Sequence, residues 1–142
     1  MNSRIIQVAR WLPFLLVAGL SLWVAGGLPG TRKPFQLDLS LSAESLMQSL
    51  SKVAHYKSSA LLFLLATLAV GMRRLSLAFA LTILVGLGWE LAETTAARHH
   101  ARAADLAPDL AAALACVAVA LLVRIGLERT RRPAAEAERD AG

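Results

Sequence analysis

The sequence predicts an all-α protein built as a four-helix transmembrane bundle with a tight hairpin between helices 2 and 3. Its 142 residues are 56% hydrophobic and only 18% charged, against about 45–50% and 25% for soluble domains. The charged residues are also unevenly spaced, so that they leave four long apolar runs. Only Arg73 and Arg74 separate the second run from the third, which predicts an antiparallel helical hairpin.

The composition excludes several classes of protein. A chain this apolar is neither an ordinary soluble enzyme nor disordered. Its single cysteine, Cys116, excludes an intramolecular disulfide framework and any cysteine-based zinc site. The net charge of +5 in such a chain indicates membrane topology, so we expect the lipid bilayer as a partner and no nucleic acid.

The first predicted span covers residues 5–26. A helix over residues 5–25 alone is about 31 Å long, enough to cross the hydrocarbon core. Pro13 falls near its first turn, where proline costs least, and Gly26, Gly27, Pro29 and Gly30 end it. The alternative is a cleavable signal peptide. The long apolar stretch and the absence of an A-x-A site favour a retained anchor.

Three further helices are expected over 53–72, 75–97 and 104–125. The uncharged parts of these runs, 58–72, 75–89 and 110–123, are each short for a full span. They become long enough only if ionisable residues at one end belong to the helix and lie near the membrane. Residues 1–127 therefore form one membrane domain, and we expect the polar tail 128–142, which contains Pro133, to be disordered.

The basic residues predict the orientation of the bundle. With both termini inside the cell, nine Lys and Arg side chains lie on the cytoplasmic side and six on the outer side. Arg73 and Arg74 count most, because the positive-inside rule is strongest in short loops. We therefore expect a multi-pass protein of the cytoplasmic (inner) membrane with the N- and C-termini inside. Trp11 then marks the inner interface, and Trp23, Tyr56 and Trp89 mark the outer one.

The long connection over 35–51 has two interpretations. Leu37, Leu39 and Leu41 alternate with polar residues, and apolar residues then recur at helical spacing from Leu46. One interpretation is an amphipathic segment that lies on the outer membrane surface. The other is a solvated linker, and the pattern alone does not separate them.

Three polar pairs fall at the outer ends of the last three helices, at spacings that put both members of a pair on one helix face. These pairs are Lys52 and His55, Glu90 and Glu93, and Asp105 and Asp109. Burying a charged side chain in a membrane is costly, so residues that stay there despite the cost are functional candidates. Aspartate suits the start of a helix, whereas glutamate at the end of a helix opposes the helix dipole. We therefore give Glu90 and Glu93 more weight. The alternative without a function is a salt-bridge network that only joins the helix ends.

The order of these motifs resembles the VanZ-like family of small integral membrane proteins, named for a protein linked to teicoplanin resistance. That family carries Lys-x-x-His, then Glu-x-x-Gln, an Arg-containing loop, Asp-x-x-x-Asn and small residues. The matching segments here are 52–55, 90–93, the loop with Arg98 and Arg102, 105–109 and the alanines of 111–113.

This sequence departs from the family pattern at several positions. Glu93 replaces the glutamine, Asp109 replaces the asparagine, Ser51 replaces an acidic residue and Ser59 replaces a tyrosine. Alanines also stand in place of the glycines of the last span, and the loop arginine does not align cleanly. The two changes from amide to carboxylate make the site more acidic and raise the odds of cation binding.

The resemblance implies a place in the cell envelope more than a reaction. We expect an outward-facing polar site that binds an amphipathic envelope ligand, such as a lipid-linked glycan intermediate or a lipoglycopeptide. This interpretation requires neither a cofactor nor catalysis. The candidate ligand-binding residues are Lys52, His55, Glu90, Glu93, Arg98, Arg102, Asp105 and Asp109.

Two alternatives belong to other classes. In a membrane-embedded hydrolase acting on a lipid-linked substrate, His55 would be the catalytic base and Asp105 its orienting partner, or carboxylates and histidines would hold a divalent cation. The sequence contains no metalloprotease, serine-hydrolase or phosphate-loop motif in support. The other alternative is a structural subunit of a membrane complex, whose small residues pack against a partner.

Overall fold

The computed structural model describes residues 3–27, 34–96 and 101–140, and it confirms the all-α prediction. Within these ranges four helices are long and apolar enough to cross a membrane. The elements in chain order are α1 (Ser3–Gly27), β1 (Leu37–Asp38), α2 (Ala43–Leu50), α3 (Val53–Val70), α4 (Leu75–Glu93), β2 (Ala101–Arg102), the 3-10 turn η1 (Ala103–Asp105) and α5 (Leu106–Asp140).

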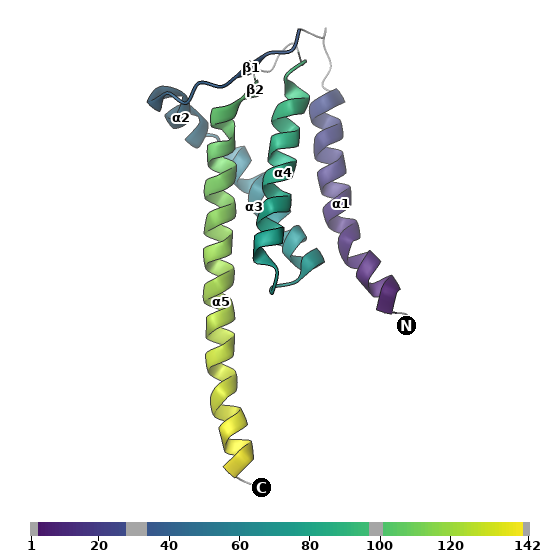
Figure 1. The fold of residues 1–142 in the computed structure, drawn as a ribbon, viewed down its shortest axis with the longest axis vertical. Coiled ribbons are helices and arrows are strands. Elements are labelled where there is room, and N and C mark those ends of the chain that lie inside the picture. The colour runs from purple at the N-terminus through teal and green to yellow at the C-terminus, as the bar shows by residue number, and fades with distance from the viewer. Residues whose placement is uncertain (1–2, 28–33, 97–100, 141–142) are drawn as a thin grey trace.

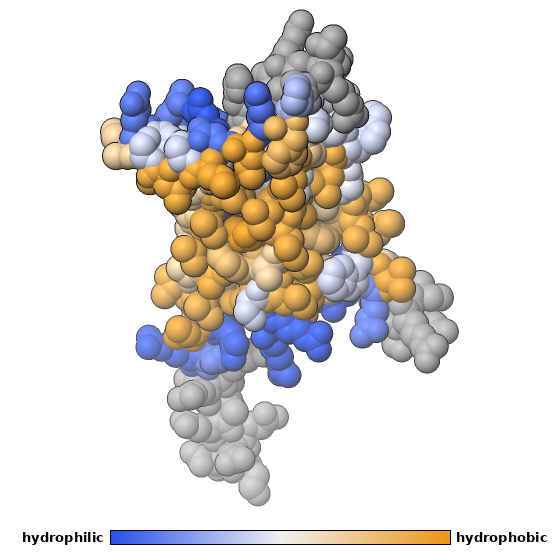
Figure 2. Space-filling model, turned by 45° about the horizontal axis from the view of Figure 1, so that its top comes forward, coloured by the Kyte–Doolittle hydropathy of each residue, from blue (hydrophilic) through white to orange (hydrophobic). Residues whose placement is uncertain are grey.

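The hairpin of α3 and α4 forms the middle of the bundle, and both of its helices pack against α1 and α5. Figure 1 shows the start of α1, the α3–α4 turn and the C-terminal half of α5 toward one end, and α2, β1 and β2 at the other. Figure 2 shows a broad apolar belt between two polar bands. An apolar belt with polar rims is the surface expected of a protein that crosses a bilayer.

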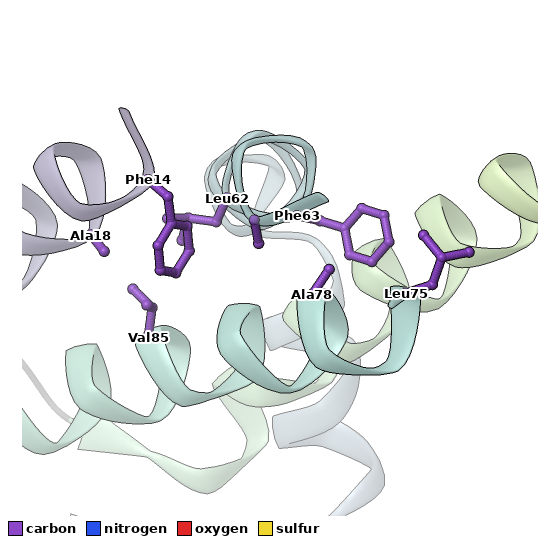
Figure 3. Close-up of a cluster of buried hydrophobic side chains, with 8 residues drawn as sticks. Phe14, Ala18, Leu62, Phe63, Leu75, Ala78 and Val85 are labelled. Atoms are coloured by element: carbon purple, nitrogen blue, oxygen red, sulfur yellow. The ribbon is translucent and has the colours of Figure 1, made fainter. Parts of the chain in front are cut away.

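The buried apolar core is small and joins α1 to the hairpin. Phe14 of α1 points toward Leu62 of α3 and Val85 of α4, and Phe63 lies nearer Leu75 at the turn (Figure 3). Most of the large leucines instead lie on the outer surface of the four long helices. A soluble protein would bury these side chains, whereas in a bilayer they face lipid at no cost.

The turn between α3 and α4 is as short as the sequence predicts. Gly71 ends α3 with a positive φ of 87°, and its N–H donates to Thr67 O at 2.8 Å. Arg10 of α1 donates from Nε to the carbonyl of Leu68 at 3.0 Å, which satisfies one of the carbonyls left open at the helix end. The helix therefore ends at Val70, two residues before the predicted boundary.

Gly71→Ala is expected to destabilise the fold by about 1 kcal/mol, because an L-residue is strained at this φ. The measurement is the free energy of unfolding in detergent micelles. Gly126→Ala is the matched control, since a Cβ at that helical glycine meets nothing within 4 Å. Equal stability of the two variants would contradict a strained position at Gly71.

The connection before α3 is structured. β1 pairs in parallel with β2, with Leu37 opposite Ala101 and Asp38 opposite Arg102. After β1 the backbone N–H of Ser40 donates to Asp38 Oδ1 at 2.9 Å, and this bond lowers the pKa of that carboxyl. Residues 43–50 then form the helix α2, as the helical spacing of the sequence suggests.

Two further boundaries differ from the sequence prediction. Helix α4 ends at Glu93, not at 97, and turn residues follow it. The backbone of α5 continues to Asp140, although we expect a disordered tail from residue 128. The tail is rich in alanine, glutamate and arginine, which are strong helix formers, and it extends a helix that is already nucleated.

Candidate functional site

The polar pairs predicted from the sequence meet at the end of the bundle that carries α2, β1 and β2. Lys52 immediately precedes α3 and His55 lies in its first turn. Asp105 ends η1, and Asp109 lies in the first turn of α5. Since α3 and α5 start at the same end and pack side by side, residues at matching depths on the two helices face each other.

Asp105 makes the first contact between the start of α3 and the start of α5. The residue is buried, at 3% exposure. Lys52 Nζ donates to Oδ2 at 2.6 Å, and Ser49 Oγ of α2 donates to Oδ1 at 2.6 Å. Both carboxylate oxygens therefore have strong donors, which is the condition for keeping an ionised carboxylate away from water.

Asp109 holds the second contact, one helical turn deeper. Ser59 Oγ donates to Oδ1 at 2.6 Å, and His55 Nδ1 lies 3.3 Å from the same oxygen. An ionised carboxylate can only accept, so the proton of the histidine sits on Nδ1 and Nε2 remains for another partner. The hydrolase alternative pairs His55 with Asp105, whereas the structure places Asp109 beside His55, because the first turn of α3 lies level with the first turn of α5.

The two glutamates make different contacts from the aspartates. Glu90 is buried, and its Oε2 accepts the backbone N–H of Arg102 at 3.2 Å. Glu93 Oε1 accepts Trp89 Nε1 at 2.7 Å within the same helix. Glu90 thus bonds to the last residue of β2, whereas the aspartates contact the side chains of Lys52 and His55. The greater weight that the sequence analysis gives to the glutamates stays a prediction.

Arg102 is the third basic side chain of the site, after Lys52 and His55. Its guanidinium donates from Nη1 to Gln48 Oε1 of α2 at 2.6 Å. The fork of Arg102 retains further N–H groups for an acceptor on a ligand. Arg98, the other arginine predicted for the site, lies outside the described residues, as do His99 and His100.

These residues surround a pocket of 720 Å³. Its polar lining includes both aspartate pairs, Glu93 and Arg102. Its apolar lining comes from the sides of α3 and α4, with Leu62 and Val85 at the deep end. A volume of this size, polar on one side and apolar on the other, suits a ligand of mixed character.

Comparisons with models of protein families, with curated proteins and with solved structures find no match for this chain. The geometry of the pocket therefore carries the functional argument.

The cation alternative gains nothing from the geometry. Among the residues that the structure describes, no group of three or more His, Cys, Asp or Glu side chains is placed to hold a metal ion. Both aspartates already accept hydrogen bonds from hydroxyl groups and face a basic side chain. Metal binding would have to displace these donors.

Sequence reasoning misses two residues that complete the site. Ser49 and Ser59 are buried, and each donates its hydroxyl to one of the aspartates. Ser59 lies four residues after His55 and shares its face of α3, whereas Ser49 lies in α2, before the helix breaks at Ser51 and Lys52. Serine is common in helices and loops, so this spacing means little until the opposing aspartates are known.

Proposed function

We propose that this protein binds an amphipathic ligand in the pocket at one end of its membrane-spanning bundle. The observation that carries the proposal is the pairing of Lys52 and His55 with two buried aspartates around a cavity that also has an apolar wall. The pocket thus offers polar side chains and an apolar wall to the same ligand.

The pairing supports binding more than it supports stability. Buried ion pairs contribute little net stability, because desolvation offsets their attraction. The aspartates are almost fully buried, whereas the side chains of Lys52 and His55 are 38% and 20% exposed. The carboxylates thus fix two partly exposed donors at the pocket, where they can meet phosphate, carboxylate or hydroxyl groups.

The resemblance to the VanZ-like family supports a ligand of the cell envelope as part of this proposal. A lipid-linked glycan intermediate and a lipoglycopeptide both combine a long apolar chain with many hydrogen-bonding groups. The positive-inside rule supports an extracytoplasmic position for the pocket, since Arg73 and Arg74 lie at the opposite end of the bundle. An envelope ligand and an extracytoplasmic pocket both fit a protein that lowers susceptibility to glycopeptide antibiotics.

Teicoplanin susceptibility of an expressing host tests this proposal. The parent chain is expected to raise the inhibitory concentration at least fourfold over an empty vector. Arg102→Gln is expected to remove that protection, because it deletes the guanidinium that faces the pocket. Lys57→Gln is the control, since Lys57 is exposed on α3 and does not line the pocket. Equal susceptibility of the parent and the empty vector, at matched membrane abundance, would refute the glycopeptide ligand.

A second candidate function follows from the contact between His55 and Asp109. A histidine oriented by a carboxylate is a common general base, and its free Nε2 would take a proton from water that attacks a lipid-linked substrate. Ser59 Oγ donates to Asp109 and Ser58 Oγ to backbone carbonyls, so neither hydroxyl donates to the imidazole of His55. Release of a water-soluble headgroup by the parent and its loss in His55→Gln would favour this hydrolase.

A further inference from the structure

The pocket reaches the outer surface on the side of α3. Val53, Ala54 and Ser58 all line the pocket, and all three are exposed. They lie in the first turns of a helix that is long and apolar enough to span the membrane. The opening that they border therefore lies on the lateral surface of the bundle.

An exposed apolar row leads to this opening. Met47 and Leu50 of α2 are 74% and 44% exposed, and Val53 is 60% exposed. Met47 and Leu50 lie three residues apart and share one face of α2, and Val53 begins α3 after Ser51 and Lys52. The row continues down α3 through Leu61, Leu64 and Leu68, which share the face of Val53 and are also exposed.

The opposite side of α2 is tied to the pocket. Ser49 donates to Asp105 and Gln48 accepts from Arg102, both at 2.6 Å. These bonds fix the rotation of α2 about its axis, so that Met47 and Leu50 point away from the polar cluster. In water this arrangement would leave a contiguous apolar row uncovered beside a polar site. At a membrane surface the same arrangement places each face in its preferred solvent.

We propose that the pocket opens sideways into one leaflet of the bilayer, with α2 lying at the membrane surface as one edge of the opening. The ligand is then a lipid that already resides in the leaflet. Its headgroup meets Lys52, His55 and Arg102, and its chain leaves past Ala54 and Ser58 into the bilayer. This inference rests on the proposed function of the pocket and adds the route and the class of the ligand.

The position of α2 is tested by spin labels on full-length protein in liposomes, in a Cys116→Ala background. Met47→Cys carries the label on the apolar row, and Ser45→Cys carries it on the other side of the same helix, about 200° away around the axis. We expect oxygen, which concentrates in the bilayer, to relax the Met47 label at least threefold more than an aqueous nickel chelate does. The reverse order is expected at Ser45. An aqueous Met47 label would overturn the membrane position of α2.

The lateral opening is tested by native mass spectrometry of the purified protein for retained lipid. Ser58→Trp places a large side chain at the opening and is expected to lower lipid occupancy at least fivefold. Leu64→Trp is the matched control, because it is exposed on the same helix but does not line the pocket. Undiminished occupancy in Ser58→Trp would overturn the lateral route and leave the pocket function intact. A parent that retains no amphiphile at all would refute the proposed function and the lipid ligand together, whatever the position of the Met47 label.

Discussion

Lys52→Met is expected to lower the free energy of unfolding by about 2–3 kcal/mol and to abolish ligand retention. The variant leaves the buried carboxylate of Asp105, a residue that is 3% exposed, with Ser49 as its remaining hydrogen-bond donor among the described residues. Removing one partner of a fully buried ion pair costs about 3–5 kcal/mol. The side chain of Lys52 is 38% exposed, so water replaces part of what it provides and the expected cost is smaller.

The measurement is unfolding in detergent micelles followed by circular dichroism. The double variant Lys52→Met, Asp105→Leu is expected to recover most of the lost stability, because no unpaired charge remains. Arg124→Met is the control, since it breaks an exposed pair with Glu128 at 2.9 Å and is expected to cost less than about 0.5 kcal/mol. If Lys52→Met and Arg124→Met destabilise equally, the Lys52–Asp105 pair is not a buried one.

The four spans and the hairpin follow from the sequence because they depend on local features. Apolar runs of sufficient length, bounded by charge, specify helices that lipid will accept. Gly71 and the two arginines after it leave too few residues for anything except a tight turn. The helix ends are less determined, since they depend on contacts from other elements such as the bond from Arg10 to Leu68.

The site is only partly predictable for a related reason. Helical spacing shows that Lys52 and His55 share a face, as do Asp105 and Asp109, and topology brings both faces to one end of the bundle. Which acid meets which base depends on the relative depth of α3 and α5, and that depth is a tertiary property. This relative depth places Asp109, and not Asp105, beside His55.

The connection over 35–51 is also only partly predictable from the sequence. Its pattern allows an amphipathic helix, but the role of each face appears only when the partners of Ser49 and Gln48 are known. The sequence places Leu46 and Met47 on an apolar face. The structure adds that the polar face is bonded to the pocket, which joins the membrane surface to the ligand site.

Gly86→Ala is expected to destabilise the protein by about 1–3 kcal/mol and to weaken ligand retention, because it overpacks the wall of the pocket. A Cβ at Gly86 lies 3.0 Å from Asp109 Oδ2 and 3.6 Å from its Cγ. Asp109 cannot yield easily, since Ser59 holds it at 2.6 Å and His55 lies 3.3 Å away. The added methyl group therefore pushes the carboxylate out of its contacts with α3.

Gly88→Ala is the matched control in the same helix, two residues away. Its Cβ would lie 2.8 Å from Leu22 Cδ2, a nominally closer contact, but that atom is the end of a flexible side chain on the exposed side of α1. Leu22 can turn aside, so this variant is expected to change stability by less than about 0.5 kcal/mol. The gain in helix propensity is common to both variants and cancels in the comparison. If Gly86→Ala and Gly88→Ala unfold alike and both retain the ligand, Asp109 does not depend on the open space at Gly86. If only Gly86→Ala fails, the close approach of α4 to the Asp109 carboxylate is part of what holds the pocket in shape.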